Sequence, residues 1–337
     1  MKKQNPIKRL FGIRGMGGAI TAFVGLIIIY IAFGIINPTV FSGQNIMNLL
    51  RSMSKYLIIG IGQSYVLITG NIDLSIGSVV GMSAMITATL MTMGVSPMAA
   101  ILISFVCCMV IGVLNGILVG KWKLPPFIAT LGTMFVARGI AYMVNGNRNT
   151  DAISSGVGKD AAETFQNVFY YGKTLGIYNT FWIAIIIFAA FFFLLSKTRT
   201  GRHIYAIGSN LDAAKLSGVS VVATTTKTYL VSAFCSFVVG LILCGQAGMG
   251  NMEAGNMYEM YAVAAGVIGG ISPLGGTGIL LGTLAGASVW QTLENGLNMI
   301  GAQVGIQRLV IGIIVVFAVL LDVVVRNGVF KKKAPSK

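Results

Sequence analysis

The stretch "ITGNIDLSIGSVVG" at residues 68–81 places one carboxylate, Asp73, between two long apolar segments. The apolar segment 55–70 precedes it and the segment 73–93 begins with it. A charged side chain inside the hydrocarbon of a membrane is costly, so an isolated acid at such a place needs a structural or a functional reason. The glycines and polar residues around Asp73 predict a break between two membrane-spanning helices.

The composition of the chain indicates a polytopic membrane protein. Of its 337 residues, 55% are hydrophobic and only 10% are charged, whereas about a quarter of the residues in a soluble domain are charged. Apolar runs of roughly 20 residues recur, and each must satisfy its own backbone hydrogen bonds in lipid, which favours helices. We therefore expect an all-α fold with about ten transmembrane helices in a single integral membrane domain, residues 1–337. The predicted spans are residues 18–36, 55–70, 73–93, 97–120, 125–145, 180–196, 228–248, 259–272, 277–297 and 306–325.

The positions of Lys and Arg predict how the chain is oriented. The net charge is +15, and the basic residues gather in short segments between the spans rather than on a soluble face, which argues against a nucleic-acid partner. Because cytoplasmic loops carry an excess of Lys and Arg, both termini are expected in the cytoplasm. The predicted soluble segments are a cytoplasmic N-terminus at 1–17, an extracytoplasmic loop at 146–179, a cytoplasmic loop at 197–227 and a basic cytoplasmic tail at 326–337.

Two of the predicted spans, 55–70 and 259–272, are short. Sixteen helical residues reach roughly 24 Å, less than the ~30 Å thickness of the hydrocarbon core. Each span leads into a glycine-rich break, near 70–76 and near 270–277, and the second break lies in "IGGISPLGGTGILLG" (268–282). Short or interrupted spans in corresponding positions point to a transport pathway.

Asp73 has two interpretations, which the sequence leaves open. It can cap the helix that follows, since a carboxylate at a helix start accepts backbone N–H groups and complements the helix dipole. It can also belong to a polar translocation pathway together with other polar residues in or near the spans. The candidate pathway residues are Gln63, Asn71, Asp73, Ser75, Asn115, Thr130, Thr133 and Asn295.

No motif in the chain predicts an enzyme or a metal site. The sequence has no G-x-x-x-x-G-K-[ST] motif, so ATP binding through a P-loop is not expected. The single histidine, His203, stands beside Arg202 in a basic segment, which argues against a multi-ligand zinc site. We expect a transport role without a cofactor or a metal on this chain.

The cytoplasmic loop 197–227 contains a stretch, "SNLDAAKLSG" (209–218), with helix signals at both ends. Ser209 or Asn210 can serve as the N-cap, and Asp212 falls in the first turn. Lys215 lies near the end, and Gly218 follows as a stop. These signals predict a compact helix of about two turns outside the membrane, against the alternative of a solvated loop.

Several motifs, in this order along the chain, resemble those of one family. They are "GNIDLSIGS" (70–78), "PPFIATLGTMFVARG" (125–139), "TRTGRHIYAIGSNLDAAKLSGVSV" (198–221), "YEMYAVAAGVIGGISPLGGTG" (258–278) and "NGLNMIGA" (295–302). Together they resemble the membrane permease subunit of bacterial ABC importers of the ribose/galactose/xylose class. The chain departs from the family pattern at Asn71, where the family usually has Gly, and at Tyr261, where it usually has a second acid.

The resemblance implies a division of labour among several proteins in the bacterial plasma membrane. Two permease chains, in a homodimer, form the pore for a monosaccharide, a separate cytoplasmic ATPase with tandem nucleotide-binding domains binds ATP, and an extracytoplasmic binding protein delivers the sugar. Glu253 and Glu259, which lie near the outer surface by the span count, would face the binding protein. The residues implied to couple the permease to the ATPase are Asn210, Asp212, Ala213, Ala214, Lys215, Leu216, Ser217 and Gly218.

Other functions compatible with the sequence remain as alternatives. Within the same family, the cargo can be another small polar solute, such as a furanose signal molecule, a polyol or a nucleoside. A secondary transporter driven by an ion gradient would need a proton or Na⁺ site within the membrane, for which Asp73 is the obvious candidate. A structural membrane protein would leave the paired helix breaks without a use.

Overall fold

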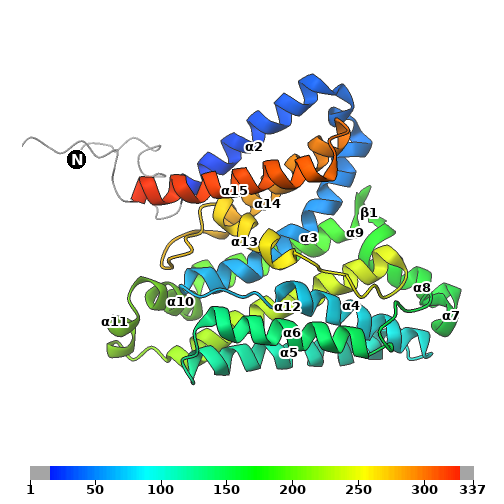
Figure 1. Cartoon of the computed structure of the whole chain (residues 1–337), viewed down its shortest axis with the longest axis horizontal. Coiled ribbons are helices and arrows are strands. Elements are labelled where there is room, and N and C mark those ends of the chain that lie inside the picture. Colours follow the sequence, from blue (N-terminus) through cyan, green and yellow to red (C-terminus); the bar gives the residue numbers. More distant parts are fainter. Residues whose placement is uncertain (1–15, 327–337) are drawn as a thin grey trace, which may run out of the picture.

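The computed structural model describes residues 16–326, which form a bundle of helices with one short pair of strands (Figure 1). The helices are α2 (Met16–Ile36), η1 (Pro38–Phe41), α3 (Gly43–Ile68), α4 (Ile76–Thr92), α5 (Pro97–Gly120), α6 (Pro126–Met143), α7 (Ser154–Val157), α8 (Lys159–Gln166), η2 (Asn167–Tyr171), α9 (Asn179–Lys197), α10 (Arg199–Ser209), α11 (Leu211–Leu216), α12 (Val221–Ala247), α13 (Tyr258–Ile268), α14 (Leu280–Met299) and α15 (Val304–Arg326). Strands β1 (Lys173–Thr174) and β2 (Ile177–Tyr178) form an antiparallel hairpin. Most of the predicted N-terminus (1–17) and basic tail (326–337) lies outside the described residues.

The prediction of an all-α membrane fold is confirmed in its coarse form. A helix occupies the place of each predicted span, namely α2 to α6, α9 and α12 to α15. Within residues 16–326, five helices are long and apolar enough to cross a membrane by length and composition: α2, α5, α6, α9 and α12. That all ten helices cross the bilayer stays a prediction.

The helices pack in two groups that share α3. In one group α12 packs against α3, α4 and α5, and in the other α14 packs against α2, α3 and α13. The outward faces of α2, α5 and α6 expose large apolar side chains such as Ile28, Val106 and Phe135. An apolar outer surface of this extent suits contact with lipid.

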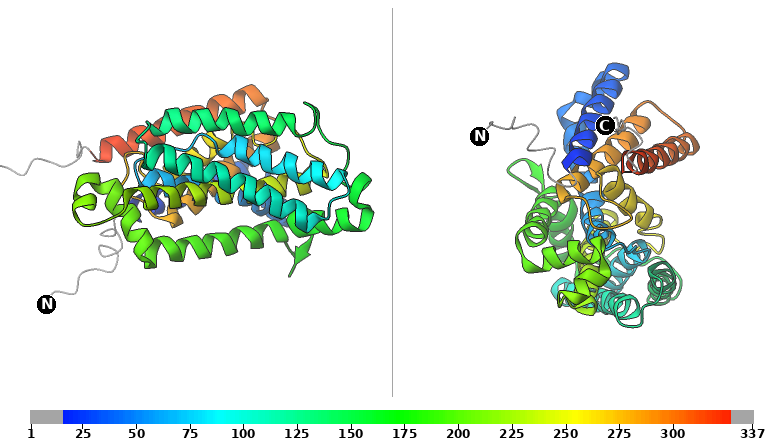
Figure 2. Two further views of the ribbon diagram at one scale, coloured as in Figure 1. Left: turned by 90° about the horizontal axis from the view of Figure 1, so that it is seen from below. Right: turned by 90° about the vertical axis from the view of Figure 1, so that its left-hand side faces the viewer.

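The loops gather at the two ends of the bundle. Helices α10 and α11 lie at one end, and α7, α8 and the β-hairpin lie at the other (Figures 1 and 2). The predicted outer loop 146–179 and the predicted cytoplasmic loop 197–227 are therefore on opposite ends, as alternation of the spans requires.

Two expectations about helix length are wrong. Helix α3 begins at Gly43 and has 26 residues, so the span predicted at 55–70 is not a short one. The Ser42 hydroxyl caps α3, because it accepts a hydrogen bond from the N–H of Asn45 at 3.2 Å. The first half of α3 is polar, so hydropathy does not reveal that the helix begins there. Likewise, α12 begins at Val221 rather than 228 after the N-cap Ser220, and the loop 197–227 is mostly helical.

The segment 248–257 runs from α12 to α13 along one face of α4. A Cβ atom at Gly81 would lie 2.6 Å from the Ala254 carbonyl oxygen, so only glycine allows this approach. Arg138 of α6 holds the segment, because its Nη1 donates hydrogen bonds to the carbonyl oxygens of Met252 and Ala254, both at 2.9 Å. These carbonyls are the partners of Arg138 that the sequence could not identify.

The variant Arg138→Gln is expected to destabilise the protein, because the shorter, uncharged amide replaces the guanidinium that donates to two carbonyls of segment 248–257. Hydrogen bonds to charged groups contribute about 1.5–3 kcal/mol each, so a clear fall in the thermal unfolding midpoint in detergent should follow. Arg148→Gln is the matched control, since Arg148 is exposed in the loop that follows α6. Equal midpoints for the two variants would contradict the assigned role of Arg138.

Candidate functional site: the helix breaks and the coupling helices

The first break, residues 69–75, is organised around the carboxylate of Asp73, which is 2% exposed. Its Oδ1 accepts hydrogen bonds from the backbone N–H and the hydroxyl of Ser75, at 2.9 and 2.6 Å. Its Oδ2 accepts a hydrogen bond from the Ser232 hydroxyl of α12 at 2.7 Å. Because these hydrogen bonds use both carboxylate oxygens, Asp73 fixes the break to α12.

The capping interpretation of Asp73 holds in part, because Asp73 accepts a backbone N–H just before α4 without being the N-cap residue of that helix. Helix α4 begins at Ile76, its N-cap residue is Ser75, and no side chain caps it. Asp73 accepts the N–H of Ser75, one residue before the helix, so it stabilises the turn and ties it to a distant helix. No pattern in the sequence indicates the second partner, because Ser232 is one small polar residue in a long apolar helix.

Four of the predicted pathway residues form one hydrogen-bonded chain with Ser232. Asn115 of α5 donates to the Ser75 hydroxyl at 3.0 Å, and Thr133 of α6 donates to the Asn115 side-chain oxygen at 2.6 Å. Each of these five side chains is at least nine-tenths buried. In this conformation the hydrogen-bonded chain connects α12, the first break, α5 and α6, and it does not line an open space.

The side chains of the other predicted pathway residues do not take part in this hydrogen-bonded chain, although Thr133 also donates to the Thr130 carbonyl at 3.2 Å. Asn71 donates to the Thr69 hydroxyl at 2.9 Å, and Thr130 donates to the Pro126 carbonyl at 2.8 Å. Asn295 exchanges two hydrogen bonds with Asn45, at 3.0 and 3.1 Å. Gln63 is fully buried, and neither polar atom of its amide has a hydrogen-bond partner among the described residues.

The two acids expected near the outer surface lie in different surroundings. Glu253 is exposed and accepts a hydrogen bond from the Tyr142 hydroxyl at 2.9 Å. Glu259 is only partly exposed, in the first turn of α13, where its carboxylate lies against Gly77 of α4. A contact of either acid with a partner protein stays a prediction.

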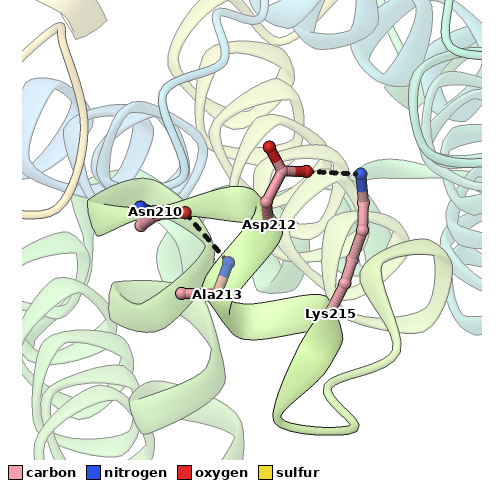
Figure 3. A network of polar contacts seen from close by, with 4 residues as sticks. All are labelled: Asn210, Asp212, Ala213 and Lys215. Atoms are coloured by element: carbon pink, nitrogen blue, oxygen red, sulfur yellow. Dashed lines mark hydrogen bonds and ion pairs between the residues drawn. The ribbon is translucent and has the colours of Figure 1, made fainter.

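The predicted helix in the cytoplasmic loop is present as α11, Leu211–Leu216, and its signals act as expected. The Asn210 side chain accepts a hydrogen bond from the N–H of Ala213 at 2.9 Å, and Lys215 pairs with Asp212 at 3.2 Å (Figure 3). Gly218 follows with a φ of 78°, the left-handed conformation that ends helices.

Helix α11 exposes apolar side chains at both of its ends. The Leu216 side chain is 91% exposed at the end of the bundle, and the Leu211 side chain is 42% exposed. Docking of a partner protein on α11 stays a prediction.

Helix α10, which the sequence did not predict, connects α11 to both breaks. The second break is residues 269–279. Gly276 of this break donates its N–H to the Ile68 carbonyl at the end of α3, at 2.8 Å. Gly208 of α10 lies against this junction, and a Cβ atom there would collide with the Ile68 carbonyl and lie 2.6 Å from the Gly276 nitrogen.

Tyr205 of α10 makes a second contact with the same break. Its hydroxyl donates a hydrogen bond to the Gly278 carbonyl at 2.7 Å. Burial raises the pKa of Tyr205 to about 12, so the hydroxyl keeps its proton at neutral pH and remains a donor. Helix α10 thus contacts the second break at Gly276 and Gly278, and it contacts the end of α3 at Ile68, where the first break begins.

A cavity of about 840 Å³ opens beside these elements. It joins the first break to α11, since Asn71 lines one part and Leu211 and Lys215 line another. Lys121 and Lys123, from the turn between α5 and α6, also line it. Three lysines around one cavity make this end of the bundle basic.

Comparisons with known proteins identify the family of the chain. Residues 45–319 match the family described as "Branched-chain amino acid transport system / permease component". The chain is 38% identical over 300 residues to the ribose import permease protein RbsC of Bacillus subtilis, covering 89% of this chain and 91% of the relative. It is 33% identical over 302 residues to the D-allose transport system permease protein AlsC of Escherichia coli, with coverages of 89% and 90%. It is 35% identical over 299 residues to the galactose/methyl galactoside import permease protein MglC of Salmonella typhimurium, with coverages of 85% and 88%.

No solved structure matches the chain. The sequence matches nevertheless extend over both helix breaks and over helices α10 and α11. Together with the apolar helices long enough to cross a membrane, they show that the chain is an integral membrane protein of this family of transport permease components.

Proposed function

We propose that this chain is the membrane-spanning subunit of an importer for a monosaccharide, driven by ATP hydrolysis on a separate protein. The observation that carries the proposal is the similarity over most of the chain to permeases named for ribose, allose and galactose. The alternative of an ion-coupled secondary transporter is not favoured, because the family comprises permease components and Asp73 is held by three hydrogen bonds inside a packed helix junction.

The partners follow from the two ends of the bundle. The α10–α11 end is basic and carries the exposed Leu216, so we assign it to the cytoplasm and to the ATPase, which would supply the ATP site. The opposite end, with α7, α8, the β-hairpin and Glu253, would then receive the sugar-binding protein. In this arrangement ten helices cross the bacterial inner membrane with both termini in the cytoplasm, and a second copy of the chain completes the pore.

The mechanism is alternating access controlled through α10. The ATPase binds α11, and its nucleotide-dependent movement displaces α10. Because Gly208 and Tyr205 contact the junction of the two breaks, this displacement opens or closes the cytoplasmic end of the pathway. A partner shifts such an equilibrium only by its differential affinity for the two states, so the permease needs no catalytic residue.

Reconstitution tests the proposal. The permease, its ATPase and its binding protein are placed in liposomes, and uptake of D-ribose, D-allose and D-galactose is measured with ATP inside. We expect ATP-dependent uptake of at least one sugar and stimulation of ATP hydrolysis by the loaded binding protein. Uptake that persists without the ATPase but collapses when the ion gradient is dissipated would contradict the proposal.

The variant Leu216→Asp is expected to separate the ATPase from the permease. Burying a new carboxylate in an apolar contact is unfavourable, so co-purification of the two proteins in detergent should fall roughly tenfold, which corresponds to about 1.4 kcal/mol. Leu175→Asp is the matched control, because Leu175 is 86% exposed in the hairpin at the opposite end. Co-purification at the level of that control would exclude α11 as the docking helix.

A further inference from the structure

An aromatic cluster around one carboxylate lies where α3, α13 and α14 meet. The rings of Tyr56, Tyr261 and Trp290 are neighbours, with centroids 5.7 Å apart for Tyr56 and Tyr261 and 5.0 Å apart for Tyr261 and Trp290. Tyr258 lies 5.6 Å from Tyr261 and 5.9 Å from Tyr56. Glu294 of α14 accepts a hydrogen bond from the Tyr56 hydroxyl at 2.8 Å. The predicted pathway residues include none of these five.

The cluster has a buried base and an accessible side. Tyr56 and Trp290 are each 5% exposed, whereas Tyr258, Tyr261 and Glu294 are partly exposed. Among the described residues, the Tyr56 hydroxyl is the one hydrogen-bond donor that reaches the Glu294 carboxylate. Lys55, the neighbour of Tyr56, donates instead to the Gln246 side chain at 3.2 Å. The carboxylate therefore keeps free acceptor capacity.

This combination of groups matches the surface of a sugar ring. A monosaccharide has a flat C–H face, which packs on aromatic rings, and hydroxyl groups, which donate to a carboxylate. Ligand sites are commonly lined by aromatic side chains with a small number of placed polar groups.

The position along the helices also suits a site in the pathway. Trp290 lies 11 residues beyond the end of the second break, which is about 16 Å along α14. Tyr56 lies 13 residues before the first break, which is about 20 Å along α3. The cluster is thus separated from the α10-controlled breaks by the length of about three helical turns, on the side away from α11.

We propose that Tyr56, Tyr258, Tyr261, Trp290 and Glu294 form a transient sugar-binding site within the membrane, where the rings pack on the sugar and Glu294 accepts its hydroxyl groups. The inference rests on the proposed import function and extends it to a site that selects among sugars. The partly exposed Tyr261 ring and Glu294 carboxylate are the groups that contact the sugar first.

Sugar selectivity of variants tests this site in the reconstituted transporter. Uptake of D-ribose, D-allose and D-galactose is compared for Tyr261→Leu and Glu294→Gln, which remove the ring and the charge. We expect uptake at limiting loaded binding protein to fall roughly tenfold and the ratio among the three sugars to change. Tyr261→Phe, which keeps the ring, and Met260→Leu, at an exposed position of the same helix, should keep the wild-type ratio.

The possible outcomes distinguish a failure of the proposed sugar-binding site from a failure of the proposed import function. Basal ATP hydrolysis reports whether each variant assembles, and Tyr261→Leu carries the test alone if Glu294→Gln does not assemble, since the Tyr261 ring is partly exposed. An unchanged ratio among the sugars in the assembled variants, with normal wild-type uptake, would overturn the site alone. A wild-type complex that imports no sugar would overturn the proposed function and this site with it.

Discussion

Replacing Gly208 with valine is expected to abolish sugar uptake while the ATPase remains bound. The added Cβ atom would collide with the Ile68 carbonyl and approach the Gly276 nitrogen to 2.6 Å. Both are backbone atoms of the junction between the two breaks, so the clash cannot be relieved by a side-chain rotation. Helix α10 must lift away from the breaks, and stimulation of ATP hydrolysis by the loaded binding protein should be lost.

Two controls make the Gly208 result specific. Gly139→Val changes a glycine of α6 whose Cβ position has no heavy atom within 4 Å, and it should leave uptake near the wild-type level. Co-purification with the ATPase should persist in Gly208→Val, because α11 and its exposed Leu216 are unchanged. Wild-type uptake in Gly208→Val would show that α10 does not act on the breaks.

Replacing Asp73 with leucine is expected to have the second large effect, this time on folding. Leucine leaves the N–H and hydroxyl of Ser75 and the hydroxyl of Ser232 without their acceptor in a fully packed junction. Each unsatisfied buried polar group costs about 1–3 kcal/mol, so the expected loss is a large part of the total stability of a typical domain. The thermal unfolding midpoint in detergent should fall sharply.

The variant Asp73→Asn distinguishes hydrogen bonding from charge. Asparagine keeps one acceptor for the N–H and hydroxyl of Ser75, and its amide can donate to the Ser232 hydroxyl, which is also able to accept. We expect near-wild-type stability and uptake for this variant. Loss of uptake in a stable, well-assembled Asp73→Asn protein would restore a charge-specific role for Asp73.

The local features of this protein could be predicted from short stretches of sequence. The breaks at 69–75 and 269–279 follow from glycines and polar residues between apolar runs, since the helical pattern stops there. The α11 helix follows from Asn210 as the N-cap and Gly218 as the stop, because a cap acts on N–H groups two or three residues away. Membrane spans can be predicted from hydropathy because hydropathy, too, depends on neighbouring residues. The predicted start of α3 is wrong because the first half of that helix is polar.

The contacts that make the site join residues far apart in the chain, and no local pattern contains them. Ser232 meets Asp73 across 159 residues, and Tyr56 meets Glu294 across 238. Each of these hydrogen bonds forms only when two segments pack in one particular register. That register depends on the sum of many apolar contacts.

The sequence by itself thus determined the family, the helical membrane fold, the two breaks and the short helix α11, because each depends on neighbouring residues. Only the tertiary structure decided what these elements touch. It placed Gly208 against the junction of both breaks and gathered four aromatic rings around Glu294. The physical reason is that helix packing brings distant segments within contact distance, whereas chain connectivity fixes only what lies within a few turns.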